Sequence, residues 1–142
     1  YLSVDITAVN DGWLLNQATG CSDILSKWSM QDCRPIAPLE DVPEQIDDEV
    51  DPPLHEVRMA QKMAGGLAWL ATRTRPDLAF IVSQLASAAT RAPQRALALG
   101  KRCLRYLAGA RNHGLELRIP HRLRWGREGT RAVPRRIRRR LV

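Results

Sequence analysis

Few side chains in this sequence have the type and spacing that catalysis requires. Its three histidines lie in no HExxH motif and in no triad-like context; they are His55, His113 and His121. Its three cysteines are widely spaced and predict neither a disulfide framework nor a Cys-x-x-Cys zinc pair; they are Cys21, Cys33 and Cys103. The glycine pair at 65 and 66 follows Lys62 and does not precede a Lys-Ser or Lys-Thr pair, so it is not a P-loop. No catalytic residue, metal ligand or cofactor site is predicted.

The side chains best suited to binding are cations on one side of a predicted helix over residues 93–108. At about 100° per residue its apolar residues share one arc; these are Ala96, Leu97, Gly100, Cys103, Leu104 and Leu107. The opposite arc has no acid and carries the residues that we call the basic ridge, Arg95, Lys101, Arg102 and Arg105. Spacing alone leaves two interpretations open, a solvated surface or a surface that contacts nucleic-acid phosphates.

Charge is divided unevenly along the chain. Residues 1–57 hold 12 acidic and 2 basic residues, whereas residues 58–142 hold 3 acidic and 20 basic residues. A second half this basic favours contact with a polyanion such as nucleic acid. The alternative is that the acidic half folds back over the basic half, or that the cations are simply solvated. The four tryptophans could stack on bases, although such residues more often lie in the core.

The first 30 residues predict a β-hairpin and a short helix. Apolar and polar residues alternate from 2 to 7, as in a half-buried strand, and Trp13-Leu14-Leu15 predicts the returning strand. Asn10-Asp11-Gly12 supplies the turn between them. Residues 22–30 predict a helix capped by Ser22. Residues 31–54 hold five prolines and many acids, which is the composition of a linker or surface loop.

Three helices and a short strand are predicted next. The first covers 55–72, and Gly65 and Gly66 in it suggest close approach of another helix, which would offset their helix-weakening effect. The second covers 76–89, and the third begins at Pro93 and ends before Gly109 as its C-cap. Residues 114–119 alternate like a strand. Residues 121–142 hold nine arginines and one acid and predict a disordered tail.

The stretch TRTRPDLAF, residues 72–80, predicts a helix start. Thr74 is a candidate N-cap, and Asp77 three residues later completes a capping pattern. No apolar run is long enough for a membrane span, and the first residues do not resemble a signal peptide.

Several segments, in order, resemble the Pol polyprotein of copia-type LTR retrotransposons, just after the reverse transcriptase palm. YLSVDI at 1–6 resembles FLGxEI, and DILSKWSMQDCRP at 23–35 resembles LLKRFGMEDCKP. AQKMAGGLAWL at 60–70 is similar to YRSLVGSLLYL, and TRPDLAF at 74–80 is similar to TRPDIAF. ALGKRCLRYLAG at 98–109 resembles AAKRVLRYLKG. The resemblance covers residues 1 to about 119, and the ordered set is more specific than any one motif.

The resemblance implies an organisation and a role. Residues 1–30 would be a primer-grip-like hairpin and short helix, with Asp11, Gly12 and Trp13 as candidate primer-grip-like residues. Residues 31–54 would be an acidic linker, 55–119 a three-helix thumb and connection region with a short strand, and 120–142 the arginine-rich tail. The whole would be a partial α+β domain, mainly α, that holds an RNA or DNA template–primer duplex. The palm and RNase H domains of the parent polyprotein would be its other partners.

The resemblance also implies what is missing. In the family, the polymerase aspartates lie upstream of the matching segment, and an RNase H metal ligand lies in an SDADWAGD-like segment downstream. Here an arginine-rich tail follows residue 119, either as a shifted-frame product or as a functional basic extension. We therefore expect no polymerase or RNase H activity from this chain alone, no cofactor in it, with magnesium serving the parent enzyme, and an intracellular location, cytoplasmic or nuclear. The alternative function is a small helical module that binds an acidic protein through its basic face.

Overall fold

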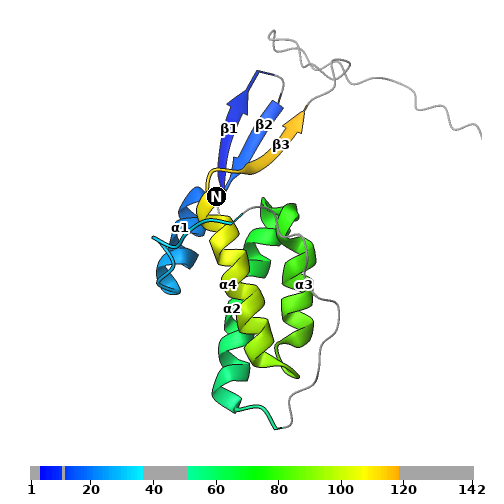
Figure 1. Ribbon diagram of the computed structural model, residues 1–142. Helices are drawn as coiled ribbons and strands as arrows, with labels where there is room; N and C mark the ends of the chain where they lie inside the picture. The colour runs from blue at the N-terminus through cyan, green and yellow to red at the C-terminus, as the bar shows by residue number, and fades with distance from the viewer. Residues whose placement is uncertain (1–3, 11, 37–50, 119–142) are drawn as a thin grey trace, which may run out of the picture.

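The computed structural model describes residues 4–10, 12–36 and 51–118, and in these the chain forms a helical bundle with a small sheet at one end (Figure 1). The elements follow the order β1 (Asp5–Val9), β2 (Gly12–Asn16), α1 (Ala18–Lys27), α2 (Leu54–Arg73), a 3₁₀ turn η1 (Pro76–Leu78), α3 (Ala79–Ala88), α4 (Pro93–Gly109) and β3 (Gly114–Arg118). The predicted fold, mainly α with an N-terminal hairpin, four helices and a short strand, is confirmed. Most of the predicted linker and the predicted tail lie outside the described residues.

The three strands form one antiparallel sheet in the order β1-β2-β3. Ile6 pairs with Leu15 and Leu15 with Leu115, while Trp13 pairs with both Ala8 and Leu117. Paired residues point to the same side, so one sheet face is wholly apolar; we call it the apolar sheet face, and it consists of Ile6, Ala8, Trp13, Leu15, Leu115 and Leu117.

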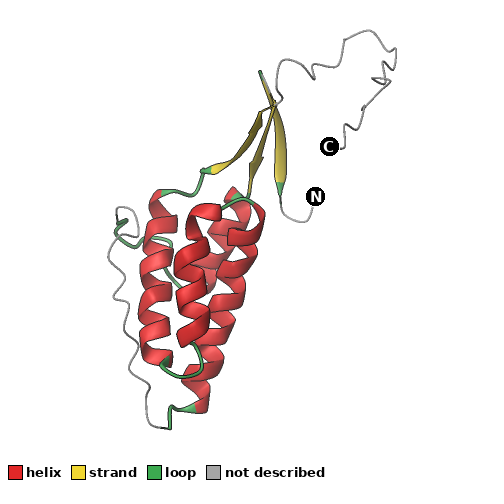
Figure 2. Ribbon diagram, turned by 90° about the vertical axis from the view of Figure 1, so that its right-hand side faces the viewer, coloured by secondary structure: helices red, strands yellow, loops and turns green. Residues whose placement is uncertain are grey.

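The prediction that the first strand is half-buried is wrong. Every residue of β1 is exposed, and Ile6 is 56% exposed. The reason is visible in Figure 2, where the sheet stands off the end of the bundle and no helix covers it. Alternation of apolar residues was read correctly as a strand, but it does not reveal whether a second layer is present.

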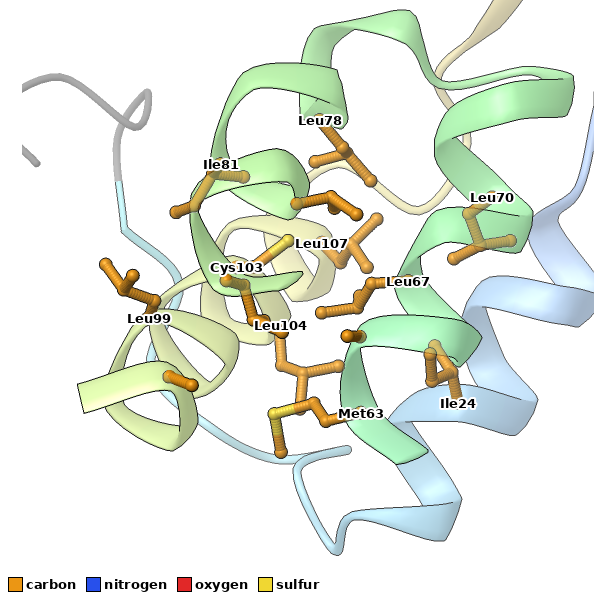
Figure 3. Close-up of a cluster of buried hydrophobic side chains, with 14 of the residues drawn as sticks. Ile24, Met63, Leu67, Leu70, Leu78, Ile81, Leu99, Cys103, Leu104 and Leu107 are labelled. Carbon is orange, nitrogen blue, oxygen red and sulfur yellow. The ribbon is translucent and has the colours of Figure 1, made fainter. Parts of the chain in front are cut away.

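The core lies among the four helices (Figure 3). Leu67 from α2, Leu85 from α3, and Leu104 and Leu107 from α4 are all fully buried. The predicted apolar arc of α4 is confirmed, with Leu97 partly buried at its edge. Burial of a side chain of this size stabilises the fold by roughly 1.5–3 kcal/mol. The apolar side of α4 therefore packs as the sequence predicts.

Helix α1 belongs to the same core and starts earlier than predicted. It begins at Ala18 after Gln17, not at a Ser22 cap. The extra turn brings in Cys21, which is buried together with Ile24 and Leu25 at helical spacing. Helix α1, which follows the hairpin in the sequence, thus shares one core with the later helices.

Two predicted glycine roles are wrong. Gly12 is the first residue of β2 and has no positive φ; a Cβ there would collide with the Leu117 carbonyl, so Gly12 allows β3 to approach. Gly109 is the last residue of α4 and not a C-cap in the left-handed region. A Cβ on Gly109 would lie 3.0 Å from Cβ of Pro35, so this glycine makes room for the segment after α1.

Candidate nucleic-acid interface

The outward side of α2 is basic and lacks acids. Its exposed cations are Arg58, Lys62 and Arg73, and no exposed residue of α2 is acidic. Gln61, Gly65 and Trp69 are also exposed and lie four residues apart, so they follow one another along the same side. We call this set of six residues the α2 outer face. This face is not among the sites predicted from the sequence, although the helical spacing that identifies the basic ridge also identifies it in residues 54–73.

The two adjacent glycines of α2 have different surroundings. A Cβ on Gly66 would lie 3.0 Å from Cδ1 of Ile24, so Gly66 allows α1 to pack closely, as predicted. A Cβ on Gly65 would meet nothing within 4 Å, so the same prediction is wrong for Gly65. A glycine inside a helix costs about 1 kcal/mol relative to alanine. No described neighbour offsets that cost at Gly65. Because glycine has no side chain, an external group can approach the backbone of α2 there.

Trp69 gives the α2 outer face an aromatic surface. Trp69 is 40% exposed, and the guanidinium carbon of Arg73 lies 4.6 Å from its ring centroid. Trp69 also borders an open hollow of about 280 Å³ between α1 and α2, whose floor includes Gly20 and Gly66. An exposed aromatic ring with a stacked guanidinium is a platform on which a nucleic-acid base or sugar can pack.

The basic ridge on α4 is partly engaged within the chain. Lys101 is exposed, whereas Arg95, Arg102 and Arg105 are half-buried. Nε of Arg105 donates to the Arg34 carbonyl at 3.0 Å, which ties the segment after α1 to α4. Contact between this ridge and phosphates stays a prediction, and Lys101 is its most accessible cation.

The structure describes two of the three candidate primer-grip-like residues, Gly12 and Trp13, and their surroundings differ. Asp11 lies outside the described residues. Gly12 is buried where β3 approaches, and Trp13 is 46% exposed on the apolar sheet face. The structure thus gives Gly12 a packing role and presents Trp13 to the outside.

TRPD does not cap a helix. The Thr74 hydroxyl donates to Oε1 of Gln17 at 2.9 Å, and η1 has no side-chain cap. Thr74 is the C-cap residue directly after α2, and both Thr74 and Gln17 are 1% exposed. The capping interpretation of Thr74 and Asp77 is wrong because a partner 57 residues away takes the hydroxyl.

Arg75 and Asp77 form a partly buried ion pair beside Tyr106. Arg75 is 1% exposed, and its Nε and Nη2 donate to the two carboxylate oxygens of Asp77 at 3.0 and 2.7 Å. The Tyr106 hydroxyl donates to Oδ2 of Asp77 at 3.0 Å. Burial disfavours the charged carboxylate, but the hydrogen bonds and charge of Arg75 outweigh it and hold the pKa of Asp77 below its usual range. This cluster has the geometry of a structural ion pair.

The described residues contain no group of three or more His, Cys, Asp or Glu side chains placed to hold a metal ion. Burial raises the pKa of the Cys103 thiol to about 12, so this cysteine is neutral at ordinary pH and unsuited to nucleophilic chemistry. The described surface is therefore better suited to binding than to catalysis, because it presents cations, an exposed tryptophan and, at Gly65, helix backbone without a side chain.

Comparison with known proteins points in one direction. The chain is 29% identical over 119 residues to a protein named Retrovirus-related Pol polyprotein from transposon RE1, of Arabidopsis thaliana. This similarity supports a retrotransposon Pol-like origin. The aligned part is 83% of this chain but spans only 8% of the length of that polyprotein.

Two other comparisons are negative. No protein family model matches the chain. No solved structure matches it either.

Among the described residues, no helix has both the length and the apolar character needed to cross a membrane.

Proposed function

We propose that this chain is part of a copia-type reverse transcriptase and holds the template–primer duplex without performing the chemistry. The α2 outer face carries the proposal, because it combines three cations with an exposed tryptophan and a glycine that the fold itself does not need. The retrotransposon Pol-like origin supports it, since an RNA-directed DNA polymerase must hold a nucleic-acid duplex.

The chemistry of the α2 outer face fits a phosphate backbone. Arg58, Lys62 and Arg73 are spread along the helix with no carboxylate among the exposed residues of α2 to neutralise them. Contacts of this kind position a duplex and carry no sequence information. Gly65 lets the backbone or sugar of a duplex approach the helix, and Trp69 provides apolar surface beside it. We expect binding that is sensitive to salt and tolerant of sequence.

The first test measures the binding of RNA–DNA and DNA duplexes of unrelated sequence to the full chain by fluorescence anisotropy at several salt concentrations. Replacing Arg58, Lys62 and Arg73 together by Gln should weaken binding and reduce the slope of log K against log salt by about 2.7 for B-DNA if each contacts one phosphate. The parallel Lys101→Gln, Arg105→Gln variant measures the contribution of the basic ridge. A wild-type chain with no salt-dependent binding would contradict the proposal.

The second test separates shape from charge. Gly65→Leu adds bulk to the α2 outer face where no side chain stands within 4 Å, so the fold should tolerate it. We expect weaker duplex binding with an unchanged salt slope. Ala86→Leu is the matched control, because Ala86 is also exposed but lies on α3. Equal affinities of the two variants would exclude α2 as the contact surface.

The same samples test the alternative function. A helical module that binds an acidic protein would bind polyglutamate at least as well as a duplex, and it would lose both through the Gln variants. Preference for the duplex, together with sensitivity to Gly65→Leu, distinguishes duplex binding from attraction to any polyanion. Magnesium-dependent primer extension by the purified chain would contradict the proposed absence of catalysis.

A further inference from the structure

We propose that Thr74, Arg75 and Asp77 are positioning residues that fix the angle at which the three-stranded sheet stands on the helical bundle. They act on the two chain segments that join the sheet to the helices. The inference concerns the protein without any ligand, so it does not rest on the proposed function.

Packing does not set this angle. In the described part of the chain, strands contact strands and helices contact helices, and no strand has more than a marginal contact with a helix. An open hollow of about 400 Å³ lies at the junction; its lining includes Thr74, Arg75, Asp77, Tyr106, His113 and Leu115. Figures 1 and 2 both show the sheet extending away from the bundle. Because the described strands have so little contact with the helices, the orientation of the sheet depends on the joints.

The first joint leads from β2 into α1. Asn16 ends the strand, Gln17 follows, and α1 begins at the next residue, so the joint has no loop. The buried Thr74 hydroxyl donates to Oε1 of Gln17. Because the backbone N–H of Thr74 also donates to the Leu70 carbonyl, at 3.1 Å, the end of α2 holds this joint.

The second joint leads from α4 into β3. Nη1 of Arg75 donates to the carbonyl of Ala110, the C-cap residue directly after α4, at 2.7 Å. A guanidinium donor makes this hydrogen bond stronger than one between neutral groups. Nδ2 of Asn16 donates to the Asn112 carbonyl at 2.9 Å and so connects the two joints directly.

Asp77 determines where Arg75 points. The carboxylate accepts hydrogen bonds from Nε and Nη2 of Arg75, which leaves Nη1 directed at the Ala110 carbonyl. The Tyr106 ring centroid lies 5.7 Å from the guanidinium carbon and its hydroxyl holds Asp77. A lysine keeps the charge but cannot contact the carboxylate with two nitrogens and the carbonyl with a third. Arg75→Lys therefore removes the orientation while keeping the cation.

The test is ¹⁵N relaxation of the full chain in solution. In the wild type, amides of β1–β3 and of α2 and α4 should report one common tumbling time. In Arg75→Lys, the sheet amides should lose that common value and tumble faster than the helix amides. Cross-strand NOEs between Leu14 and Glu116, which are paired in the sheet, should persist and show that the sheet itself is intact.

Arg73→Lys is the matched control, since it makes the same substitution two residues earlier, at an exposed site where the guanidinium lies over the Trp69 ring. It should keep the common tumbling time. The proposal is overturned if Arg75→Lys also keeps it, if Arg73→Lys loses it equally, or if the Leu14–Glu116 NOEs vanish together with the common value. The last result would mean that Arg75 stabilises the sheet and does not orient it.

If Arg75→Lys does not fold, Thr74→Val decides. Valine has nearly the same shape as threonine and removes only the hydroxyl that holds Gln17. Separate tumbling of sheet and helices in Thr74→Val, with the cross-strand NOEs intact, supports the proposal. A common tumbling time in that variant overturns it.

Discussion

Leu104 and Leu107 in the helical bundle are fully buried, whereas Ile6, Trp13 and Leu117 in the sheet are each about half exposed. Both regions are built from apolar residues at regular spacing, yet in the part of the chain that the structure describes only the bundle has a second layer to cover them. The spacing of apolar residues identifies a helix or strand, but the presence of a packing partner determines the stability of that element. The bundle should therefore unfold cooperatively around its own core, and the sheet should depend on its hydrogen bonds and on the joints below it.

The largest expected contrast comes from equal truncations in the two regions. Leu104→Ala should cost about 2–5 kcal/mol of unfolding free energy, because it leaves a cavity in the core. Leu117→Ala should cost about 0.5 kcal/mol, because that side chain is 47% exposed. Urea unfolding followed by circular dichroism measures both. Equal costs would show that the apolar sheet face is covered in solution.

The next prediction concerns the sheet alone. Gly12→Ala places a methyl group against the Leu117 carbonyl, which should cost the β2–β3 pairing about 1–3 kcal/mol. Hydrogen exchange of the β2 and β3 amides should accelerate while the amides of α2 and α4 keep their protection. Loss of protection in the helices as well would mean that the sheet and the bundle unfold as one unit.

In the bundle we expect one substitution to increase the unfolding free energy, by a smaller amount. Gly65→Ala should raise the unfolding free energy by about 0.5–1 kcal/mol, because alanine favours helix and nothing lies near the new methyl group. Gly66→Ala should gain less, because Ile24 must move by a few tenths of an ångström. Thermal unfolding of the two variants provides the comparison. A larger gain at Gly66 would contradict the difference in their surroundings.

The smallest effect is a dependence on pH at the junction between the two regions. The pKa of Asp77 is lower in the folded chain than in the unfolded chain, so its contribution to stability is complete above the unfolded value of about 3.9 and is lost as pH falls through the folded value. The contribution is modest, because the Asp77 side chain is 37% exposed and solvent screens the pair. Urea midpoints of the wild type and Asp77→Asn, measured between pH 7 and pH 2, should converge at the acid end. Parallel curves would contradict a depressed pKa.

Much of the bundle was predictable because its signals are local. Apolar spacing gave the core arc of α4, and Pro93 gave its first residue. The pairing of β3 with β2 was not predictable in this way, since their residues are about 100 positions apart and alternation carries no information about partners. The start of α1 was missed because no cap residue marks it and the chain passes directly from strand to helix.

The candidate site was predicted in part. Cations on α4 were found by their spacing, but only the structure shows that Arg105 binds a backbone carbonyl. The role of Gly65 was misjudged because two adjacent glycines look alike in a sequence and differ only in what surrounds them. Thr74 and Asp77 were interpreted as a local capping signal, whereas the Thr74 hydroxyl bonds to Gln17, 57 residues away. No role was predicted for Arg75, which contacts Ala110, 35 residues away. A local sequence pattern cannot predict which distant residues a polar side chain will contact.

The sheet also has a consequence for the lifetime of the chain. Within the described residues, β1 and β3 are the outer strands, and each pairs with β2 along one edge, beside an apolar face. Open edges of this kind template pairing with other chains and lead to aggregation. The lifetime of the chain in solution would then depend on these few strands, however well its helices are packed.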